Sequence, residues 1–451
     1  MASIQRGLAA VKEGLVELID EDAVLAACDA CGHEFRRRRL DPAEALRLQA
    51  TQIAHQYTAA SHLIRIVDGD FCESAYCQAR QRVPLEASRA AFDAFNARID
   101  ALQDNSDLVW CGRRTLLVDG SGFSLPDTPG LRAAFGTKRG WDLGLPLAHA
   151  VIAFDGHDGR IRDLHIAPAT VNDQRQMREL HPSLRPGDVV VGDRGFCSYC
   201  ELFWLKDLGC DGVMRVSSSR SIPFPARTGV RRRRSYGRGR RSEPILQRLI
   251  SVDDQIIEIV KPRNRPPYIS PECFAAVPGR MVVRAIRYRV ERDGFRVREI
   301  TLLTTLLDPA RYPAAALAEV YHLRWCAETD IRSLKRTLGM DRLRCRDEQS
   351  VRKEILMFAL VFNAVCAARA RAARKSGVPP RELSFIDTLR ALVAAQRGCL
   401  RTTRLQSTPR TLPRRDPRWH PRKLKRRNSD YAVLKCTRAE VVRWWKEQWL
   451  N

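Results

Sequence analysis

The sequence lacks a secretory signal and any apolar run long enough to cross a bilayer. Its first residues, MASIQRGLAAVKEGL, contain no continuous apolar core. The longest apolar stretch, ILMFALVFNAVCAA at 355–368, has 14 residues and lies between charged residues, whereas a membrane-spanning helix needs about 20. We therefore expect a buried helix at 355–368 and no membrane partner.

Acidic residues are scarce relative to basic ones. The 451 residues include 52 Asp and Glu against 77 Lys and Arg, which gives a net charge of +25 and a pI near 10.0. Such a balance favours a polyanionic partner, of which nucleic acid is the commonest. An anionic membrane surface would require a basic amphipathic anchor, and neither end of the chain has one. Apolar and charged contents of 44% and 29% indicate a globular chain, long enough for two to four domains.

No complete zinc motif is present. Two Cys-x-x-Cys pairs occur, Cys28/Cys31 with His33 nearby and Cys197/Cys200, but neither has a second ligand pair at matching spacing. Fourteen cysteines without a signal peptide indicate reduced thiols in a cytoplasm. We interpret both pairs as small buried residues, with zinc as the lesser alternative.

The first hundred residues favour helices. Asp41 is placed to cap a helix that starts at Pro42. Ser74 is placed to cap a short helix that ends at Arg82, and PLEASRAAFDAFNARIDAL at 84–102 forms another.

The short helix SAYCQARQR offers a candidate recognition surface for DNA. Its polar side chains include Gln78, Arg80 and Arg82. A solvated basic face explains the same pattern equally well.

From about residue 110 the pattern changes to short apolar runs. RTLLVDG at 114–120 reads as a strand, and 145–167 reads as two strands joined by a turn. Asn172 or Asp173 caps a helix, and GDVVVGDRGF at 187–196 contains another buried strand. This succession predicts an α/β core with a mixed sheet.

The segment 216–312 interrupts that core. Its Arg- and Gly-rich part at 226–242, which includes Arg232 and Arg233 as candidate DNA contacts, reads as a loop, and the alternating runs after it read as antiparallel strands. The prolines of the basic segment 408–427 prevent a regular helix. We predict five regions: a helical DNA-binding region 1–108, a first core part 109–215, a β-rich insertion 216–312, a second core part 313–375, and a helical, basic region 376–451.

The stretch YHLRWCAETDIRSLKRTLGM at 321–340 carries an unusual set of side chains. At 3.6 residues per turn, Tyr321, Arg324, Glu328 and Lys335 lie within about 60° of one another, so they are predicted to share one helix face. A second, apolar face is predicted on the other side. It consists of Leu323, Ile331, Leu334 and Leu338.

Asp119 and Asp193 each follow an apolar run and are predicted to stand at strand ends. Such residues are commonly turn or capping aspartates. Together with Glu328, however, they would form an all-oxygen site suited to Mg²⁺ or Mn²⁺. Three carboxylates can hold two ions about 3.5–4 Å apart for cleavage of a phosphodiester. Arg324 and Lys335 would then face backbone phosphates.

These residues resemble a known family. VDG (Asp119), GDRGF (Asp193) and Y-x2-R-x3-E-x6-K (from Tyr321 to Lys335), in this order, are similar to the DDE transposases of bacterial insertion sequences, within the insertion sequence four (IS-four) family. The resemblance implies an RNase H-like catalytic domain interrupted by the mostly β insertion. It implies Asp119, Asp193 and Glu328 as catalytic ligands of two Mg²⁺ or Mn²⁺ ions.

The resemblance also implies roles for residues around the acids. Tyr321, Arg324 and Lys335 would hold phosphates near the cleavage site. Arg194 is either another phosphate contact or an ion-pair partner of Asp193, and Trp325 either stacks on a base or packs in the core. The family's hairpin mechanism uses an aromatic side chain of the insertion. The candidates left open are Tyr268, Phe274, Tyr288 and Phe295.

The resulting hypothesis is a cut-and-paste transposase. It would bind double-stranded element ends and target DNA, act through a hairpin intermediate, work as a homodimer, and be found at the nucleoid of a bacterial cytoplasm. One alternative is a transposase-derived DNA-binding protein without catalytic activity. The other is a structure-specific nuclease on the same fold.

Overall fold

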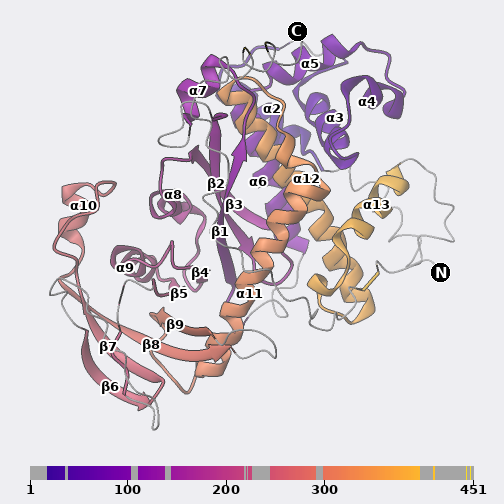
Figure 1. Ribbon diagram of the computed structural model, residues 1–451. Coiled ribbons are helices and arrows are strands. Elements are labelled where there is room, and N and C mark those ends of the chain that lie inside the picture. Colours follow the sequence, from indigo (N-terminus) through magenta and orange to yellow (C-terminus); the bar gives the residue numbers. More distant parts are fainter. Residues whose placement is uncertain are drawn as a thin grey trace.

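The computed structural model describes residues 18–35, 39–102, 110–137, 144–217, 220, 222–225, 244–290, 298–396, 410, 411, 443 and 447. A nine-stranded mixed sheet in the order β3-β2-β1-β4-β5-β9-β8-β7-β6 runs through this part of the chain (Figure 1). The strands are β1 Thr115–Ser124, β2 Leu147–Asp155, β3 Ile161–Pro168, β4 Val189–Gly192, β5 Asp211–Arg215, β6 Ile245–Ser251, β7 Asp254–Val260, β8 Arg280–Val290 and β9 Arg298–Thr304.

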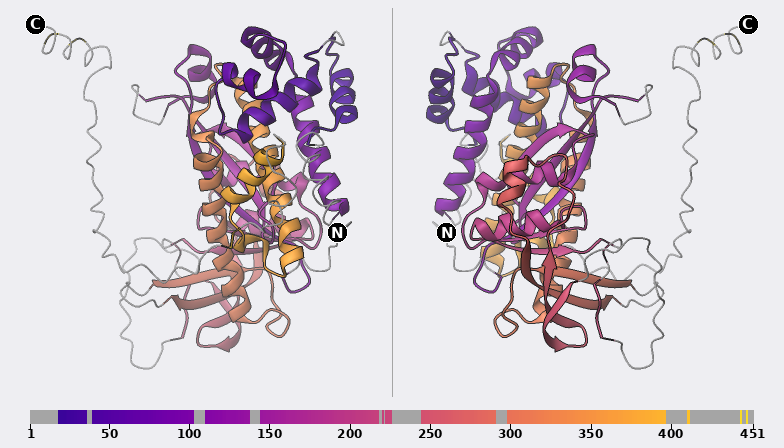
Figure 2. Two further views of the ribbon diagram at one scale, coloured as in Figure 1. Left: turned by 90° about the vertical axis from the view of Figure 1, so that its right-hand side faces the viewer. Right: turned by 90° about the vertical axis from the view of Figure 1, so that its left-hand side faces the viewer.

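Helices cover this sheet and build a separate group at one end. They are α2 Glu21–Ala30, α3 Pro42–Ala54, α4 Ala60–Val67, α5 Glu73–Arg82, α6 Leu85–Leu102, α7 Pro129–Phe135, α8 Asp173–Glu179, α9 Tyr199–Asp207, α10 Pro271–Ala276, α11 Ala314–Arg332, α12 Glu348–Ser376 and α13 Phe385–Gln396. In Figure 2 the N-terminal helices lie at one end of the molecule and β6–β9 at the other.

The sheet confirms the predicted mixed α/β core. β1, β4 and β5 run parallel to one another, and the other neighbouring strands pair antiparallel. Because β9 pairs with β5, the strands of the β-rich segment 216–312 extend the core sheet instead of forming a second one.

Both faces of the central strands are buried. Leu117 of β1 packs with α11 and α12, whereas Val118 packs with α8 and α9 on the opposite face. Successive strand residues point to opposite faces, so a strand covered on both sides requires the continuous apolar run that TLLV provides.

The apolar run at 355–368 is a buried helix, as predicted, although α12 is longer and extends over 29 residues. By length and composition α12 could cross a membrane, but 78% of its most apolar window is buried inside the protein. The core helix of a globular protein has the same character.

Polar side chains of α12 anchor the N-terminal helices. Lys353 Nζ donates to the carbonyls of Gln81 and Val83 at 2.8 and 2.7 Å, which satisfies acceptors at the end of α5. Glu354 is fully buried and accepts bonds from Tyr57 Oη and from the Arg344 amide.

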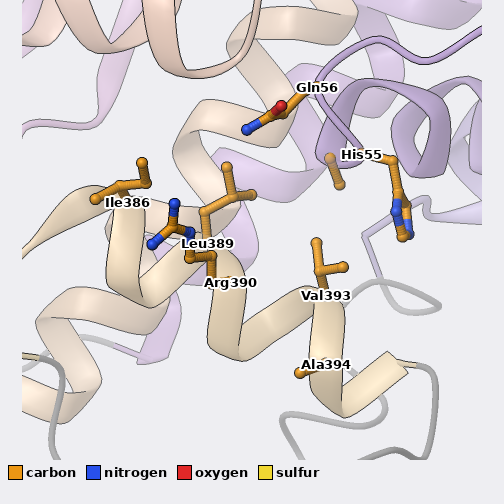
Figure 3. Close-up of a pocket in the computed structure, with 8 residues that line it drawn as sticks. His55, Gln56, Ile386, Leu389, Arg390, Val393 and Ala394 are labelled. Atoms are coloured by element: carbon orange, nitrogen blue, oxygen red, sulfur yellow. The ribbon is translucent and has the colours of Figure 1, made fainter.

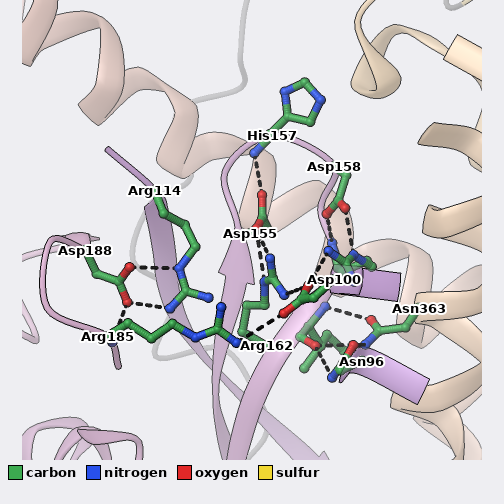
Figure 4. A network of polar contacts seen from close by, with 12 residues as sticks. Asn96, Asp100, Arg114, Asp155, His157, Asp158, Arg162, Arg185, Asp188 and Asn363 are labelled. Atoms are coloured by element: carbon green, nitrogen blue, oxygen red, sulfur yellow. Dashed lines mark hydrogen bonds and ion pairs between the residues drawn. The ribbon is translucent and has the colours of Figure 1, made fainter. Parts of the chain in front are cut away.

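A second polar network ties α6, β3 and α12 together (Figure 4). The Asn363 amide donates to Asn96 Oδ1 at 2.9 Å and to the Ile161 carbonyl at 2.8 Å. Nearby, Asp100 of α6 accepts from Arg160 and Arg162. These contacts place α12 across the sheet that carries the predicted acids.

Most predicted helix starts are confirmed. Asp41 Oδ1 accepts from the Glu44 amide at 2.8 Å, and Asn172, not Asp173, caps α8. The prediction for Ser74 is wrong: the N-cap is Cys72 and α5 begins at Glu73, two residues earlier than a Ser74 cap would give, so Ser74 lies inside its first turn.

The cysteine pairs are only partly as predicted. Cys28, Cys197 and Cys200 are buried, but Cys31 is exposed because it follows the end of α2.

Candidate active site

Asp119 and Asp193 lie at equivalent positions on neighbouring parallel strands. The pairing of β1 with β4 ends at Val118 and Gly192, so each aspartate is the next residue along its strand. The prediction that Asp119 ends its strand is wrong, because β1 continues to Ser124 through its antiparallel pairing with β2. The two carboxylates therefore meet where β1 parts from β4.

α11 packs against β1 and β4 and brings its polar face to this edge. Tyr321 Oη donates to Asp193 Oδ1 at 3.1 Å. Arg324 donates to Glu328 Oε1 at 2.8 Å and lies 3.5 Å from Asp119 Oδ2. Glu328 and both strand acids thus converge around two side chains of the same helix.

Burial and neighbouring charge perturb these groups. Burial raises the pKa of Asp119; the Gly120 amide and Arg324 oppose the rise, and the charges of Glu328 and Asp193 add to it. Burial and the nearby Asp193 carboxylate raise the pKa of Tyr321 to about 12. Tyr321 is therefore protonated at neutral pH and acts as a hydrogen-bond donor.

Lys335 lies beyond the regular part of α11 and reaches β1, the strand that carries Asp119. After Arg332 the chain forms a π-helix, Ser333–Thr337, whose wider turn changes the angle between successive side chains. Lys335 Nζ donates to the Gly122 carbonyl at 2.7 Å and lies 4.5 Å from the Phe123 ring centroid. Lys335 therefore contacts β1 at a position beyond Asp119.

The predicted apolar face of the helix is only partly buried. Ile331, Leu334 and Leu338 are buried, but 37% of Leu323 is exposed. Trp325 is 56% exposed, so the interpretation of it as a core residue is wrong. Charged side chains of α11 face the sheet, whereas Leu323 and Trp325 face solvent.

Arg194 is exposed and makes no recorded ion pair with Asp193 in the described part of the chain. The basic partner of Asp193 is Arg215, whose Nη1 lies 3.7 Å from Asp193 Oδ1. Our sequence analysis missed Arg215. It could have been found as a charged residue that ends the apolar run of the third parallel strand, β5.

His149 of β2, which packs against the other face of β1, was also missed. His149 Nε2 lies 3.5 Å from Asp173 Oδ1, and its ring packs over the Gly120 backbone, where a Cβ atom would approach His149 Cε1 to 2.7 Å. Asp173 also borders Gly195, two residues after Asp193. His149 of β2 and Asp173 of α8 therefore form a polar pair close to the acid-bearing edge, on the other face of the sheet.

The predicted DNA contacts of α5 differ in exposure. Gln78 and Arg82 are exposed and bonded to each other at 3.1 Å. Arg80 turns inward: its guanidinium lies 5.7 Å from the Tyr76 ring centroid and 3.4 Å from Gln52 Oε1. This half-buried position disfavours Arg80 as a DNA contact. Arg232 and Arg233 lie outside the described residues.

The aromatic candidates of the insertion are dispersed. Tyr288 of β8 is the one beside α11, with its ring centroid 5.7 Å from that of His322. Tyr268 hydrogen bonds Gln174, and Phe274 faces Lys261. Phe295 lies outside the described residues.

The donors at the acid-bearing edge fit a hard cation. Asp119 and Glu328 both approach the Arg324 guanidinium, and carboxylate oxygens are the ligands that Mg²⁺ and Mn²⁺ prefer. In the present arrangement no three His, Cys, Asp or Glu side chains of the described residues are close enough together to hold a metal ion. The positive charge between the acids is that of Arg324.

Two cavities lie away from the three acids. One of about 370 Å³ lies between the end of α3 and α13, beside His55, Leu389 and Val393 (Figure 3). The other, of about 460 Å³, lies at the opposite end of β1 and β4 and is lined by five arginines and two aspartates. Neither cavity is lined by Asp119, Asp193 or Glu328.

Comparisons with known proteins show which family the chain belongs to. Residues 110–364, more than half of the chain, match the family described as "Transposase DDE domain". The chain is similar to the transposase InsG for insertion sequence element IS4 of Escherichia coli (strain K12), with 26% identity over 328 residues. That match covers 70% of this chain and 65% of the relative, which is less than two thirds of the relative's length.

Among solved structures, the chain resembles the piggyBac transposase synaptic complex with hairpin DNA, determined by cryo-EM. The TM-score is 0.41 and the identity 9%, with 89% of this chain and 82% of that chain covered.

Proposed function

We propose that this chain, which belongs to the DDE transposases in the family of insertion sequence IS4, cuts DNA at the ends of its element and joins those ends to target DNA. The observation that carries the proposal is the convergence of Asp119, Asp193 and Glu328 from β1, β4 and α11. These carboxylates belong to distant parts of the sequence: Asp119 and Glu328 share Arg324, and Tyr321 of the same helix bonds Asp193.

DDE transposases use divalent metal ions, and these three carboxylates would hold them. We propose two Mg²⁺ or Mn²⁺ ions per site, which would activate the attacking oxygen and stabilise the leaving oxygen of a phosphodiester. Tyr321 holds Asp193 in orientation through its hydroxyl.

The cations around the acids would bind the DNA backbone. Arg324, Lys335 and the exposed Arg194 lie along the same edge, where each would neutralise a phosphate without reading sequence. Hydrolysis of one strand frees a 3′-hydroxyl. Attack of that hydroxyl on the opposite strand would form a hairpin, which a second hydrolysis opens before the 3′-end is joined to target DNA.

The fold supports an RNase H-like catalytic domain formed from 109–215 and 313–375. Its acids come from β1, from the residue after the adjacent parallel strand β4, and from α11. The segment 216–312 lies between β4 and α11 in the sequence and adds its strands to the sheet beside β5. We propose the N-terminal helices and the region 376–451 as DNA-binding parts. Gln78 and Arg82 are the exposed candidates on α5.

The net charge of +25 supports double-stranded DNA as the partner. We further propose a homodimer that pairs two element ends, in a bacterial cytoplasm at the nucleoid.

The test is cleavage of a labelled DNA that bears the element's own ends, in Mg²⁺, by wild type and by Glu328→Gln. The proposal expects wild type to nick at the element boundary and then yield a hairpin, while the variant binds the same DNA without cutting it. Binding without cleavage by both proteins would favour a silenced DNA-binding protein. Cleavage of unrelated branched DNA in preference to element ends would favour a nuclease.

A further inference from the structure

The groups proposed to bind phosphate are already paired within the protein. Arg324 is bonded to Glu328 and Asp119, and Lys335 to the Gly122 carbonyl. Each of these groups must therefore exchange a protein partner for a phosphate when DNA arrives.

Arg324 is the central member of this set. Its side chain is only 11% exposed, and it touches Asp119 and Glu328, whose side chains are 21% and 34% exposed. In this setting one guanidinium compensates two carboxylates, which would otherwise repel each other at short range. Its Nε atom is buried and has no hydrogen-bond partner among the described residues, so the protein does not fully satisfy Arg324 where it stands.

The position of Arg324 conflicts with metal binding by the same carboxylates. A divalent ion held by Asp119 and Glu328 needs the oxygen atoms that the guanidinium now contacts. Arg324 cannot leave without a replacement cation, because two partly buried carboxylates would remain uncompensated. Metal ion and arginine therefore compete for the same acids.

We propose that Arg324 is a built-in counter-ion of the metal site, and that its displacement couples metal binding to DNA binding. This inference rests on the function proposed above. In the free protein Arg324 occupies the cation position between Asp119 and Glu328. A divalent ion releases it, and the released guanidinium then takes a backbone phosphate.

Two consequences follow from thermodynamic linkage. The free protein binds divalent ions more weakly than its carboxylates alone would allow, since part of the binding energy is spent on displacing Arg324. Divalent ions tighten DNA binding, and DNA tightens metal binding by the same factor. Without Arg324 the penalty on metal binding and the coupling both disappear.

The first experiment measures Mn²⁺ binding to the full chain without DNA, by electron paramagnetic resonance of the free ion. The proteins are wild type, Arg324→Met, Asp119→Asn and a control, Arg336→Ala, which removes an exposed arginine that pairs with Asp341 instead of the three acids. We expect Arg324→Met to bind Mn²⁺ about tenfold more tightly than wild type, in the usual range of coupling between sites. The control should equal wild type, and Asp119→Asn should lose binding.

The second experiment measures the affinity for element-end DNA with and without Ca²⁺, by fluorescence anisotropy. We expect Ca²⁺ to tighten DNA binding by wild type and by Arg336→Ala, but not by Arg324→Met. Arg324→Lys, which keeps the charge on a side chain that cannot bridge both acids, should show intermediate values and serves as the second variant if Arg324→Met fails to fold by circular dichroism.

The outcomes separate the inference from the proposed function. If wild type binds Mn²⁺ through Asp119 but Arg324→Met binds no more tightly, the counter-ion role is refuted and the metal site stands. If Asp119→Asn binds Mn²⁺ as wild type does, the metal site itself is wrong, and both proposals fall.

Discussion

Replacing Tyr321 by Phe should separate the chemical step from DNA binding. The ring is 95% buried and would stay in place, so the change removes one contact, the 3.1 Å hydrogen bond to Asp193 Oδ1. A hydrogen bond to a charged group contributes about 1.5–3 kcal/mol. If that energy holds Asp193 in its reactive orientation, the cleavage rate should fall by about 10- to 150-fold.

Arg215 offers a comparison at the same carboxylate. Its Nη1 lies 3.7 Å from Asp193 Oδ1, and both side chains are about one third exposed. An ion pair of this kind contributes about 0–1 kcal/mol. Arg215→Gln should therefore slow cleavage by no more than about fivefold, clearly less than Tyr321→Phe does.

Single-turnover cleavage of element-end DNA at saturating protein measures the rate, and anisotropy measures the dissociation constant. Tyr321→Phe should lower the rate with an unchanged dissociation constant, because the lost bond acts on an acid and not on the DNA. A weakened dissociation constant with an unchanged rate would refute this reasoning and assign Tyr321 to phosphate contact alone. A larger rate loss in Arg215→Gln would make Arg215 the main support of Asp193.

Three further predictions concern stability and titration. Arg284→Met leaves the Asp254 carboxylate without its partner inside the sheet, where the pair is bonded at 2.5 and 2.8 Å and the two side chains are 0% and 6% exposed. The free energy of unfolding, measured in urea, should fall by about 3–5 kcal/mol. A fall of less than about 1 kcal/mol would contradict the prediction. Lys353→Met removes the donor to two carbonyls at the end of α5. Each lost bond should cost about 1–3 kcal/mol, and limited proteolysis should cut the N-terminal helices faster than in wild type. Burial lowers the pKa of His149 and Asp173 opposes this, so Asp173→Asn should lower it further in an NMR titration, and a rise would exclude the contact.

Much of the acid-bearing edge could be predicted from the sequence, because the strand and helix patterns are local. A parallel strand buried on both faces needs an uninterrupted apolar run, so a charged residue directly after TLLV or VVVG marks where the strand leaves its neighbour. Helical spacing likewise brings Tyr321, Arg324 and Glu328 to one side of α11. The resemblance to the DDE transposases rests on these same positions.

Other residues were decided by contacts that no local pattern encodes. Arg215 reaches Asp193 only because β5 lies beside β4, and His149 meets Asp173 only because α8 packs on β2. Lys335 lies in the π-helical turn Ser333–Thr337, which regular helical spacing does not predict.

The sequence by itself determined which residues carry charge at the ends of buried strands and along one helix face. Only the tertiary structure decided their partners. Arg324 lies between Asp119 and Glu328, which are more than 200 positions apart in the sequence. Because α11 is buried against the sheet, these two carboxylates are the ones that its guanidinium reaches. Apolar burial thus determines where the elements lie. The need to compensate the charges that burial brings together then determines how the site is arranged.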